Sequence, residues 1–265
     1  MEQEKRLSAL RPLVDLDRLQ TAFRTGTGKG IRICVIDSGV DGKHPALAGK
    51  IRAQYDVLTG SSGVRCVPAE PTDSIGHGTA CSGIILQLAP EADLYSVKVI
   101  GREAKGTAEQ LVAGLAFALD QKFDIINMSL GTTDERVSRG LEALADRAFH
   151  EGGILVAAAN NFKQVAYPAQ FSSVLGVDME GFENPESLRY DWGRPIELAA
   201  RGVYVEAPAM GGGTQLFTGT SFACPHVTGL LARLLSVFPG LAGFEARFVL
   251  SLLASAQEPN SQQPE

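Results

Sequence analysis

The chain has 265 residues, of which 45% are hydrophobic and 20% are charged, a composition ordinary for one globular domain. The charges are mixed along the sequence and sum to −6, which argues against a nucleic-acid partner. The sequence contains neither the ~20 consecutive apolar residues of a membrane span nor the apolar core of a secretion signal near Met1. We therefore expect a cytoplasmic protein that does not bind a membrane, and its oligomeric state stays open.

The expected secondary structure alternates between buried strands and helices. Apolar runs typical of strands cover residues 31–36, 93–99, 124–128, 153–158 and 173–178. Helical patterns begin near His77 and cover residues 107–121, 136–150, 221–237 and 244–253. Strands that are apolar throughout and separated by helices predict an α/β protein, a three-layer fold whose mainly parallel central sheet has helices on both faces.

The chain is expected to form a single domain over residues 1–255, with residues 1–27 as an N-terminal extension that packs on it. Residues 256–265 offer almost nothing apolar to bury, so we predict a disordered C-terminal tail.

The four cysteines form no Cys-x-x-Cys pair and are too few for a disulfide scaffold. We expect free and mostly buried thiols, with one or two disulfide bridges as the alternative. These residues are Cys34, Cys66, Cys81 and Cys224.

Four polar residues fall where predicted strands end or helices begin. Asp37 ends the first strand, Asn161 follows the strand over 153–158, and His77 and Ser221 open helices. Open parallel sheets bind ligands beyond the carboxyl ends of their strands, so these four side chains are expected to converge on one edge.

The chemistry of these residues is that of a hydrolytic triad. The Ser221 hydroxyl needs a base to become a nucleophile, and His77 can accept its proton while a buried Asp37 holds the imidazole. Attack on a peptide carbonyl creates an oxyanion, for which Asn161 and the backbone N–H of Ser221 are the expected donors. Ser221 alone could be a helix cap, but the joint occurrence of these residues predicts a serine peptidase.

From about Gly28 to about Phe238 the sequence resembles the subtilisin-like serine peptidases. The motifs that carry the resemblance are Asp37-Ser38-Gly39, His44-Pro45, His77-Gly78-Thr79, Asn127-Met128-Ser129-Leu130-Gly131, Ala157-Ala158-Ala159-Asn160-Asn161, Tyr167-Pro168 and Gly219-Thr220-Ser221 with Pro225-His226-Val227. The resemblance implies a subtilisin-like fold and a serine endopeptidase that hydrolyses peptide bonds through an acyl-enzyme on Ser221. We expect no cofactor.

The resemblance also implies that a peptide or protein substrate binds in an extended conformation, between the segment 129–131 and the segment around Gly106. The small side chains of Ala158 and Ala166 are expected to line the pocket next to the cleaved bond, which favours an apolar or medium-sized residue on the acyl side. The expected substrate-binding residues are Ser129, Leu130, Gly131, Gly106, Ala158 and Ala166.

Three positions depart from the family's pattern. Ala46 stands where the family often has a calcium-binding aspartate, and the connection after Ile85 lacks the loop that commonly wraps the ion, so we predict no metal there. Ala80 replaces the family's second histidine. Asn160 stands where glycine is common, which leaves two candidate amides for the oxyanion, of which we favour Asn161.

No propeptide-like domain precedes Gly28, so we expect that the chain folds unaided or that a leader has been removed. Its short length, cysteines and missing calcium loop resemble the peptidases that process ribosomally made peptides, including cyanobactin-type maturation proteases. This resemblance implies the processing of a peptide or protein precursor. The alternatives are a peptidyl transferase or macrocyclase that uses the same acyl-enzyme, and a catalytically inactive peptide-binding pseudo-protease.

Overall fold

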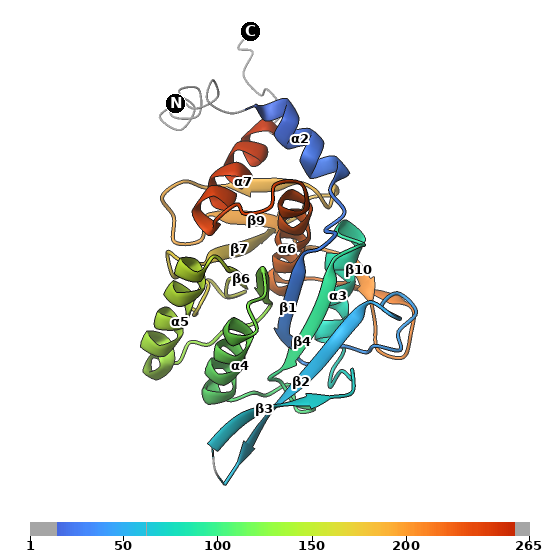
Figure 1. The fold of residues 1–265 in the computed structure, drawn as a ribbon, viewed down its shortest axis with the longest axis vertical. Coiled ribbons are helices and arrows are strands. Elements are labelled where there is room, and N and C mark those ends of the chain that lie inside the picture. Colours follow the sequence, from blue (N-terminus) through green and yellow to red (C-terminus); the bar gives the residue numbers. More distant parts are fainter. Residues whose placement is uncertain (1–14, 62, 258–265) are drawn as a thin grey trace.

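The computed structural model describes residues 15–61 and 63–257, and its centre is one nine-stranded sheet with helices on both faces (Figure 1). The strands lie across the sheet in the order β3 (Gly63–Ala69), β2 (Ile51–Gly60), β4 (Asp93–Lys98), β1 (Arg32–Asp37), β5 (Ile125–Met128), β6 (Ile154–Ala158), β7 (Leu175–Glu180), β9 (Leu198–Arg201) and β8 (Leu188–Tyr190). The edge strands β3 and β8 are antiparallel to their neighbours, and all pairs between them are parallel. The predicted three-layer α/β fold with a mainly parallel sheet is therefore confirmed.

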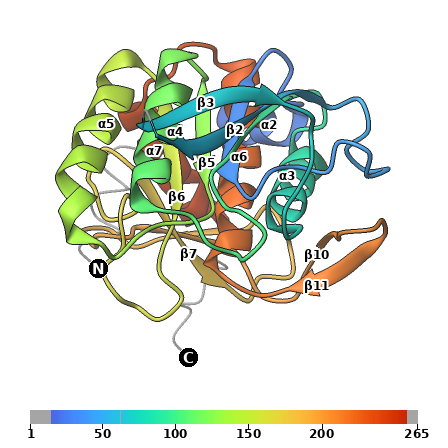
Figure 2. The ribbon, with the colours of Figure 1, turned by 90° about the horizontal axis from the view of Figure 1, so that it is seen from below.

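The helices form the two outer layers. One face of the sheet carries α2 (Leu16–Thr25), α3 (His77–Leu88), α6 (Thr220–Val237) and α7 (Gly243–Gln257). The other face carries α4 (Ala108–Asp120) and α5 (Ser138–Glu151), the latter preceded by the short 3₁₀ helix η2 (Glu135–Val137). A separate hairpin of β10 (Val205–Pro208) and β11 (Thr214–Phe217) projects beside α3 and α6 (Figure 2).

Strand β1 shows why the central strands are apolar throughout. Successive side chains of a strand point to opposite faces of the sheet. Ile33 and Val35 pack into the core beneath α3 and α6, which we call the first core. Cys34 and Ile36 pack into the core beneath α4 and α5, which we call the second core. All four side chains are fully buried, so neither face of this strand tolerates a polar side chain until Asp37 at its end.

The N-terminal end of the described chain packs on the domain as expected, whereas the C-terminal end differs from the prediction. Helix α2 in the N-terminal extension buries Leu19 and Phe23 in the first core. Helix α7 continues through Gln257, so the disordered tail predicted from residue 256 is wrong for residues 256 and 257, which are helical. Residues 1–14 and 258–265 lie outside the described part of the chain.

The connection between α3 and β4 bears on the family's calcium site. It spans only residues 89–92, so the loop that commonly wraps the ion in the family is missing. Ala46 presents a methyl group. Calcium takes about six to eight oxygen ligands, and in residues 15–61 and 63–257 the one cluster of potential metal ligands includes the thiol of Cys81. The residues present do not fit a calcium site.

We therefore expect calcium chelation to leave the melting temperature unchanged. The measurement is thermal unfolding of the purified protein with and without EGTA, with a subtilase that retains the calcium loop as the positive control. A fall of several degrees in this chain, as in the control, would show that it binds calcium through ligands outside the family's site.

Candidate active site

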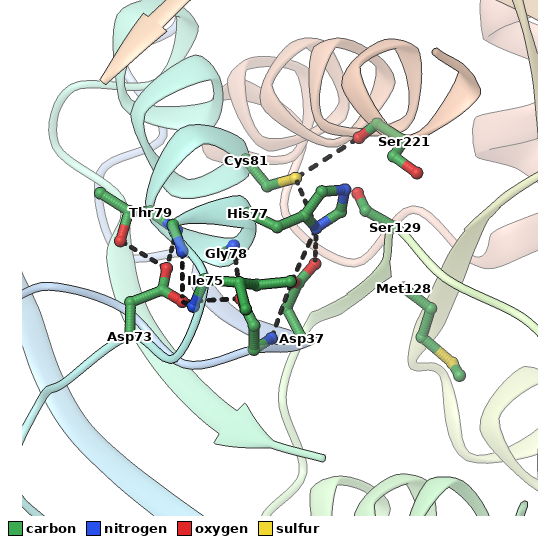
Figure 3. A network of polar contacts seen from close by, with 12 residues as sticks. Asp37, Asp73, Ile75, His77, Gly78, Thr79, Cys81, Met128, Ser129 and Ser221 are labelled. Atoms are coloured by element: carbon green, nitrogen blue, oxygen red, sulfur yellow. Dashed lines mark hydrogen bonds and ion pairs between the residues drawn. The ribbon is translucent and has the colours of Figure 1, made fainter. Parts of the chain in front are cut away.

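The site lies at the carboxyl edge of the sheet, where β1 ends at Asp37. The Asp37 side chain is fully buried. Its carboxylate accepts from the Ser38 N–H at 2.7 Å, and its two oxygens lie 2.8 and 3.0 Å from Nδ1 of His77 (Figure 3). Because the carboxylate can only accept, Nδ1 of His77 carries the ring proton and Nε2 is left as the basic nitrogen.

Two glycines permit this close contact between β1 and α3. A Cβ added to Gly78 would lie 2.1 Å from the Gly39 carbonyl oxygen and 3.1 Å from Cβ of Asp37. Gly39 itself has φ +98°, in the left-handed region, and a Cβ there would lie 2.1 Å from the Thr72 carbonyl oxygen. A larger residue at Gly78 would push β1 and α3 apart, whereas one at Gly39 would displace the segment that carries Thr72.

Asp37 sets the basicity of His77. Burial acts to lower the pKa of His77, but the charge of Asp37 and its hydrogen bond to Nδ1 act against burial, and the net effect is a raised pKa. The imidazolium that forms when His77 accepts a proton is therefore stabilised in place. The ring also packs against Phe222, with its centroid 5.3 Å from the phenyl centroid.

Ser221 is the second residue of α6 and is half-buried. Pro225 lies four residues later in the same helix and has no N–H, so the Ser221 carbonyl lacks its intrahelical donor. The thiol of Cys81 on α3 donates to this carbonyl at 3.4 Å, and its sulfur lies 3.9 Å from Nδ1 of His77 (Figure 3). Burial raises the pKa of Cys81, so the thiol keeps its proton and links the helix of the base to the helix of the nucleophile.

In the described part of the chain, the Ser221 hydroxyl makes no hydrogen bond to His77. Figure 3 shows Ser221 on the side of the imidazole that lies opposite Asp37. Contacts between a nucleophile and its base often tighten only when substrate binds, so this geometry is consistent with the role expected of Ser221.

The hydrogen bonds of the two neighbouring asparagines distinguish them. The Thr220 N–H donates to Oδ1 of Asn161 at 2.9 Å. Because an N–H can only donate, the oxygen of the Asn161 amide must face Thr220, which leaves its NH₂ group to face the cleft. Oδ1 of Asn160 instead accepts from the Phe162 N–H at 2.7 Å and closes a local turn. This arrangement favours Asn161 as the oxyanion donor.

Two cavities adjoin the site and contain most of the expected substrate-binding residues. One, of about 300 Å³, lies between the segment around Gly106 and the segment with Leu130 and Gly131. The other, of about 160 Å³, contacts Ser221 and Asn161 and is lined by Ala158 and Ala166. The predicted residues thus line cavities beside the site, and their role in substrate binding stays a prediction.

Ser129 lies beside His77 (Figure 3) but lines neither cavity. It is buried, and its hydroxyl accepts from Nδ2 of Asn127 at 3.0 Å. Asn127 also accepts from the Thr228 hydroxyl at 2.8 Å and from the Cys224 thiol at 3.4 Å, which ties the end of β5 to α6. All four cysteines are free thiols.

Several residues at the site were not identified from the sequence. Thr132 and Thr133 line the smaller cavity, and Thr220 orients Asn161. Thr220 lies in the Gly-Thr-Ser motif, so its position next to Ser221 was a usable signal. The contact of Cys81 with the Ser221 carbonyl depends on the packing of two separate helices, and the sequence carries no signal for it.

Comparison with known proteins gives consistent matches. A protein-family model described as the subtilase family matches residues 28–263. Subtilisin E of Bacillus subtilis (strain 168) is 32% identical over 236 residues, which cover 83% of this chain and 59% of that protein. Thermitase of Thermoactinomyces vulgaris is 31% identical over 227 residues, which cover 81% of this chain and 78% of thermitase.

Solved structures agree with these sequence matches. The S41 psychrophilic protease superposes with a TM-score of 0.74 at 26% identity, covering 90% of this chain and 89% of that one. Sphericase gives a TM-score of 0.73 at 28% identity, covering 88% of this chain and 87% of that one. The chain thus matches most of these structures, but it spans only 59% of the full length of subtilisin E.

The opposite environments of His77 and His226 give a prediction for NMR titration. We expect His77 to titrate above the ordinary value of about 6.5. His226 should titrate below that value, because burial lowers its pKa to about 4. Asp37→Asn should lower the pKa of His77, since a neutral amide no longer stabilises the imidazolium, and should leave His226 unchanged. A His77 pKa that stays the same or rises in Asp37→Asn would contradict the assigned pair.

Proposed function

Because this chain belongs to the subtilase family, we propose that it is a serine endopeptidase that cleaves peptide bonds through an acyl-enzyme on Ser221. The observation that carries the proposal is the buried Asp37–His77 hydrogen bond beside a cleft that contains both Ser221 and Asn161. A peptide-binding protein without activity would have no need for a buried carboxylate paired with an imidazole that is 23% exposed.

In the first half of the reaction, Ser221 Oγ attacks the peptide carbonyl carbon while His77 Nε2 takes the hydroxyl proton. Asp37 keeps Nδ1 protonated and stabilises the resulting imidazolium. The carbonyl oxygen becomes negative and accepts from the Asn161 amide and from the Ser221 N–H, which lies in the first turn of α6 where helical N–H groups lack intrahelical acceptors. His77 then returns the proton to the leaving nitrogen as the C–N bond breaks.

In the second half, water attacks the ester that joins the acyl group to Ser221. His77 accepts a proton from this water and passes it to Ser221 Oγ as the ester bond breaks. The products are a carboxylate and the restored enzyme. An amine in place of the water would give a new peptide bond, so the same site could in principle support transpeptidation.

The substrate proposed for this site is a peptide or protein segment in an extended conformation. The support is the cleft between the segment around Gly106 and the segment 130–132. On its outer side the latter segment pairs with Tyr167 through Thr132, so the side facing the cleft is the one available to a substrate strand. The small Ala158 and Ala166 side chains favour an apolar or medium-sized residue on the acyl side of the cleaved bond.

We further propose that the physiological task is to process a precursor in the cytoplasm. Support comes from the resemblance to peptide-maturation proteases, from the free thiols of the four cysteines, and from the lack of fit to a calcium site. Precursor processing should leave few cleavage products in the proteome. Comparing new protein N-termini in cells with the wild type and with Ser221→Ala would reveal the substrate, and indiscriminate cleavage would contradict a processing role.

The activity itself is tested by reaction with a fluorophosphonate. We expect one adduct per molecule, on Ser221, detected by intact-protein mass spectrometry and peptide mapping. His77→Ala should abolish it, because no base then takes the hydroxyl proton, whereas the exposed His150→Ala should not. The labelling rate should rise with pH through the pKa of His77, since only the neutral imidazole accepts a proton.

An unlabelled but folded wild type would overturn the peptidase proposal in favour of a peptide-binding role. With an unlabelled peptide substrate, product mass separates the two acyl-enzyme reactions, because hydrolysis adds the mass of one water and cyclisation does not.

The two asparagines make a matched pair of variants for the oxyanion site. We expect Asn161→Ala to lower kcat by about 10²–10³-fold with little change in KM, because it removes a donor that acts mainly in the transition state. Asn160→Ala removes a side chain of the same size whose amide is used in the adjoining turn, and it should retain far more activity. Equal losses of activity in the two variants, or a larger loss in Asn160→Ala, would show that Asn161 is not the oxyanion donor.

A further inference from the structure

Asp73 is the centre of a hydrogen-bond network next to the triad (Figure 3). Its Oδ1 accepts from the Ser38 hydroxyl at 2.7 Å, the Ile75 N–H at 3.1 Å and the Gly76 N–H at 2.9 Å. Its Oδ2 accepts from the Thr79 N–H at 2.8 Å and the Thr79 hydroxyl at 2.6 Å. Every partner donates, which is the pattern that an ionised carboxylate satisfies.

These partners lie on both segments that carry the Asp–His pair. Ser38 directly follows Asp37 at the end of β1, whereas Gly76 directly precedes His77 and Thr79 lies two residues after it. One carboxylate therefore fixes the position of the acid's strand relative to the base's helix. The backbone reinforces the link, because the Ser74 N–H donates to the Ser38 carbonyl at 2.9 Å.

Helix α3 depends on this carboxylate for its N-terminal cap. The N-cap residue is Gly76, which is in the left-handed conformation and has no side chain to accept from the first helical N–H groups. The Gly78 N–H donates to the Ser38 hydroxyl oxygen at 3.1 Å, and the Thr79 N–H donates to Asp73. A negative charge at this end of a helix is also favoured by the helix dipole.

The hydroxyls of Ser38 and Thr79 extend the network in both directions. Ser38 donates to Asp73 and accepts from Gly78, and Thr79 donates to Asp73 while accepting from the Asp41 N–H at 2.9 Å. Each hydroxyl thus uses its proton on Asp73. Removal of the carboxylate would free both hydroxyls to rotate and would loosen the start of α3.

From this geometry we propose that Asp73 is a positioning residue for the Asp37–His77 pair. It sets the orientation of the imidazole relative to the acid and the nucleophile without contacting substrate. The expected effect of Asp73 on the reaction rate rests on the proposed peptidase activity. Its expected effect on the position of the imidazole rests only on the Asp37–His77 hydrogen bond. A displacement of about 1 Å at such a pair costs about 10²-fold in rate.

The test compares Asp73→Ala and Asp73→Asn with the wild type in three measurements. We expect kcat, and the rate of fluorophosphonate labelling at Ser221, to fall by about 10²-fold, while KM changes little because the cleft is intact. We also expect the downfield proton NMR resonance of the His77 Nδ1–H to broaden or disappear as that hydrogen bond loosens. Asp73→Asn keeps the size of the side chain and replaces one accepting oxygen with a donor, so it remains informative if Asp73→Ala does not fold.

Asp15→Ala is the matched control. Asp15 also caps a helix, since its carboxylate accepts from the Arg18 N–H at 3.0 Å at the start of α2, and it is exposed. It should lower the melting temperature somewhat and leave the kinetics unchanged. Ser38→Thr, which retains the bridging hydroxyl, should keep more activity than Ser38→Ala.

The outcomes separate this inference from the proposed function. If both folded Asp73 variants keep the wild-type kcat and NMR resonance, Asp73 only stabilises the fold and the inference is wrong. A wild type that is not labelled at all defeats the peptidase proposal. In that case loss of the His77 resonance in the Asp73 variants would still support the positioning role, and its retention would refute it.

Discussion

The residues of the site at the carboxyl edge of the sheet are arranged around one buried negative charge. Asp37 is fully buried at the end of β1, and an unpaired carboxylate in such a place would cost several kcal/mol of stability. The surrounding structure provides what the charge requires: the Ser38 N–H, the Nδ1 proton of His77, and glycines at positions 39 and 78 that bring these donors within reach. The negative charge of Asp37 makes the side chain costly to bury, but the same charge stabilises a cation on the neighbouring imidazole.

The base and the nucleophile are held together by a second link between their helices. Pro225 leaves a carbonyl of α6 without a backbone donor, and the thiol of Cys81 on α3 supplies one. The cost of a proline inside a helix is thereby reduced at the turn that carries Ser221. Asn127 forms a comparable link on the other side, between the end of β5 and α6. The polar groups of the site thus bond to one another across elements that are distant in sequence.

The sequence was most informative where the structure depends on local patterns. The runs at residues 31–36 and 124–128 are apolar because both faces of the central strands are buried, and this pattern predicted the sheet. The sequence analysis missed β2 and β3, whose residues are mostly exposed or half-buried, and it also missed β8–β11. Asp37, His77, Asn161 and Ser221 stand in recognisable motifs at strand and helix ends. Asp73 does not, since the contact that links its segment to β1, from the Ser38 hydroxyl, forms only after β1 and α3 have packed.

The residues of the site are divided between the two cores on either side of the sheet. Base and nucleophile stand on α3 and α6, which pack on the first core, whereas Leu130 and the residues around Gly106 adjoin α4 and the second core. Changes in volume beneath α4 can reshape the cleft without being transmitted directly to the reacting groups, because the sheet separates the two layers. Such a division lets mutations in the α4 layer change the wall formed by Leu130 and the residues around Gly106 while the other layer keeps the base and the nucleophile in place.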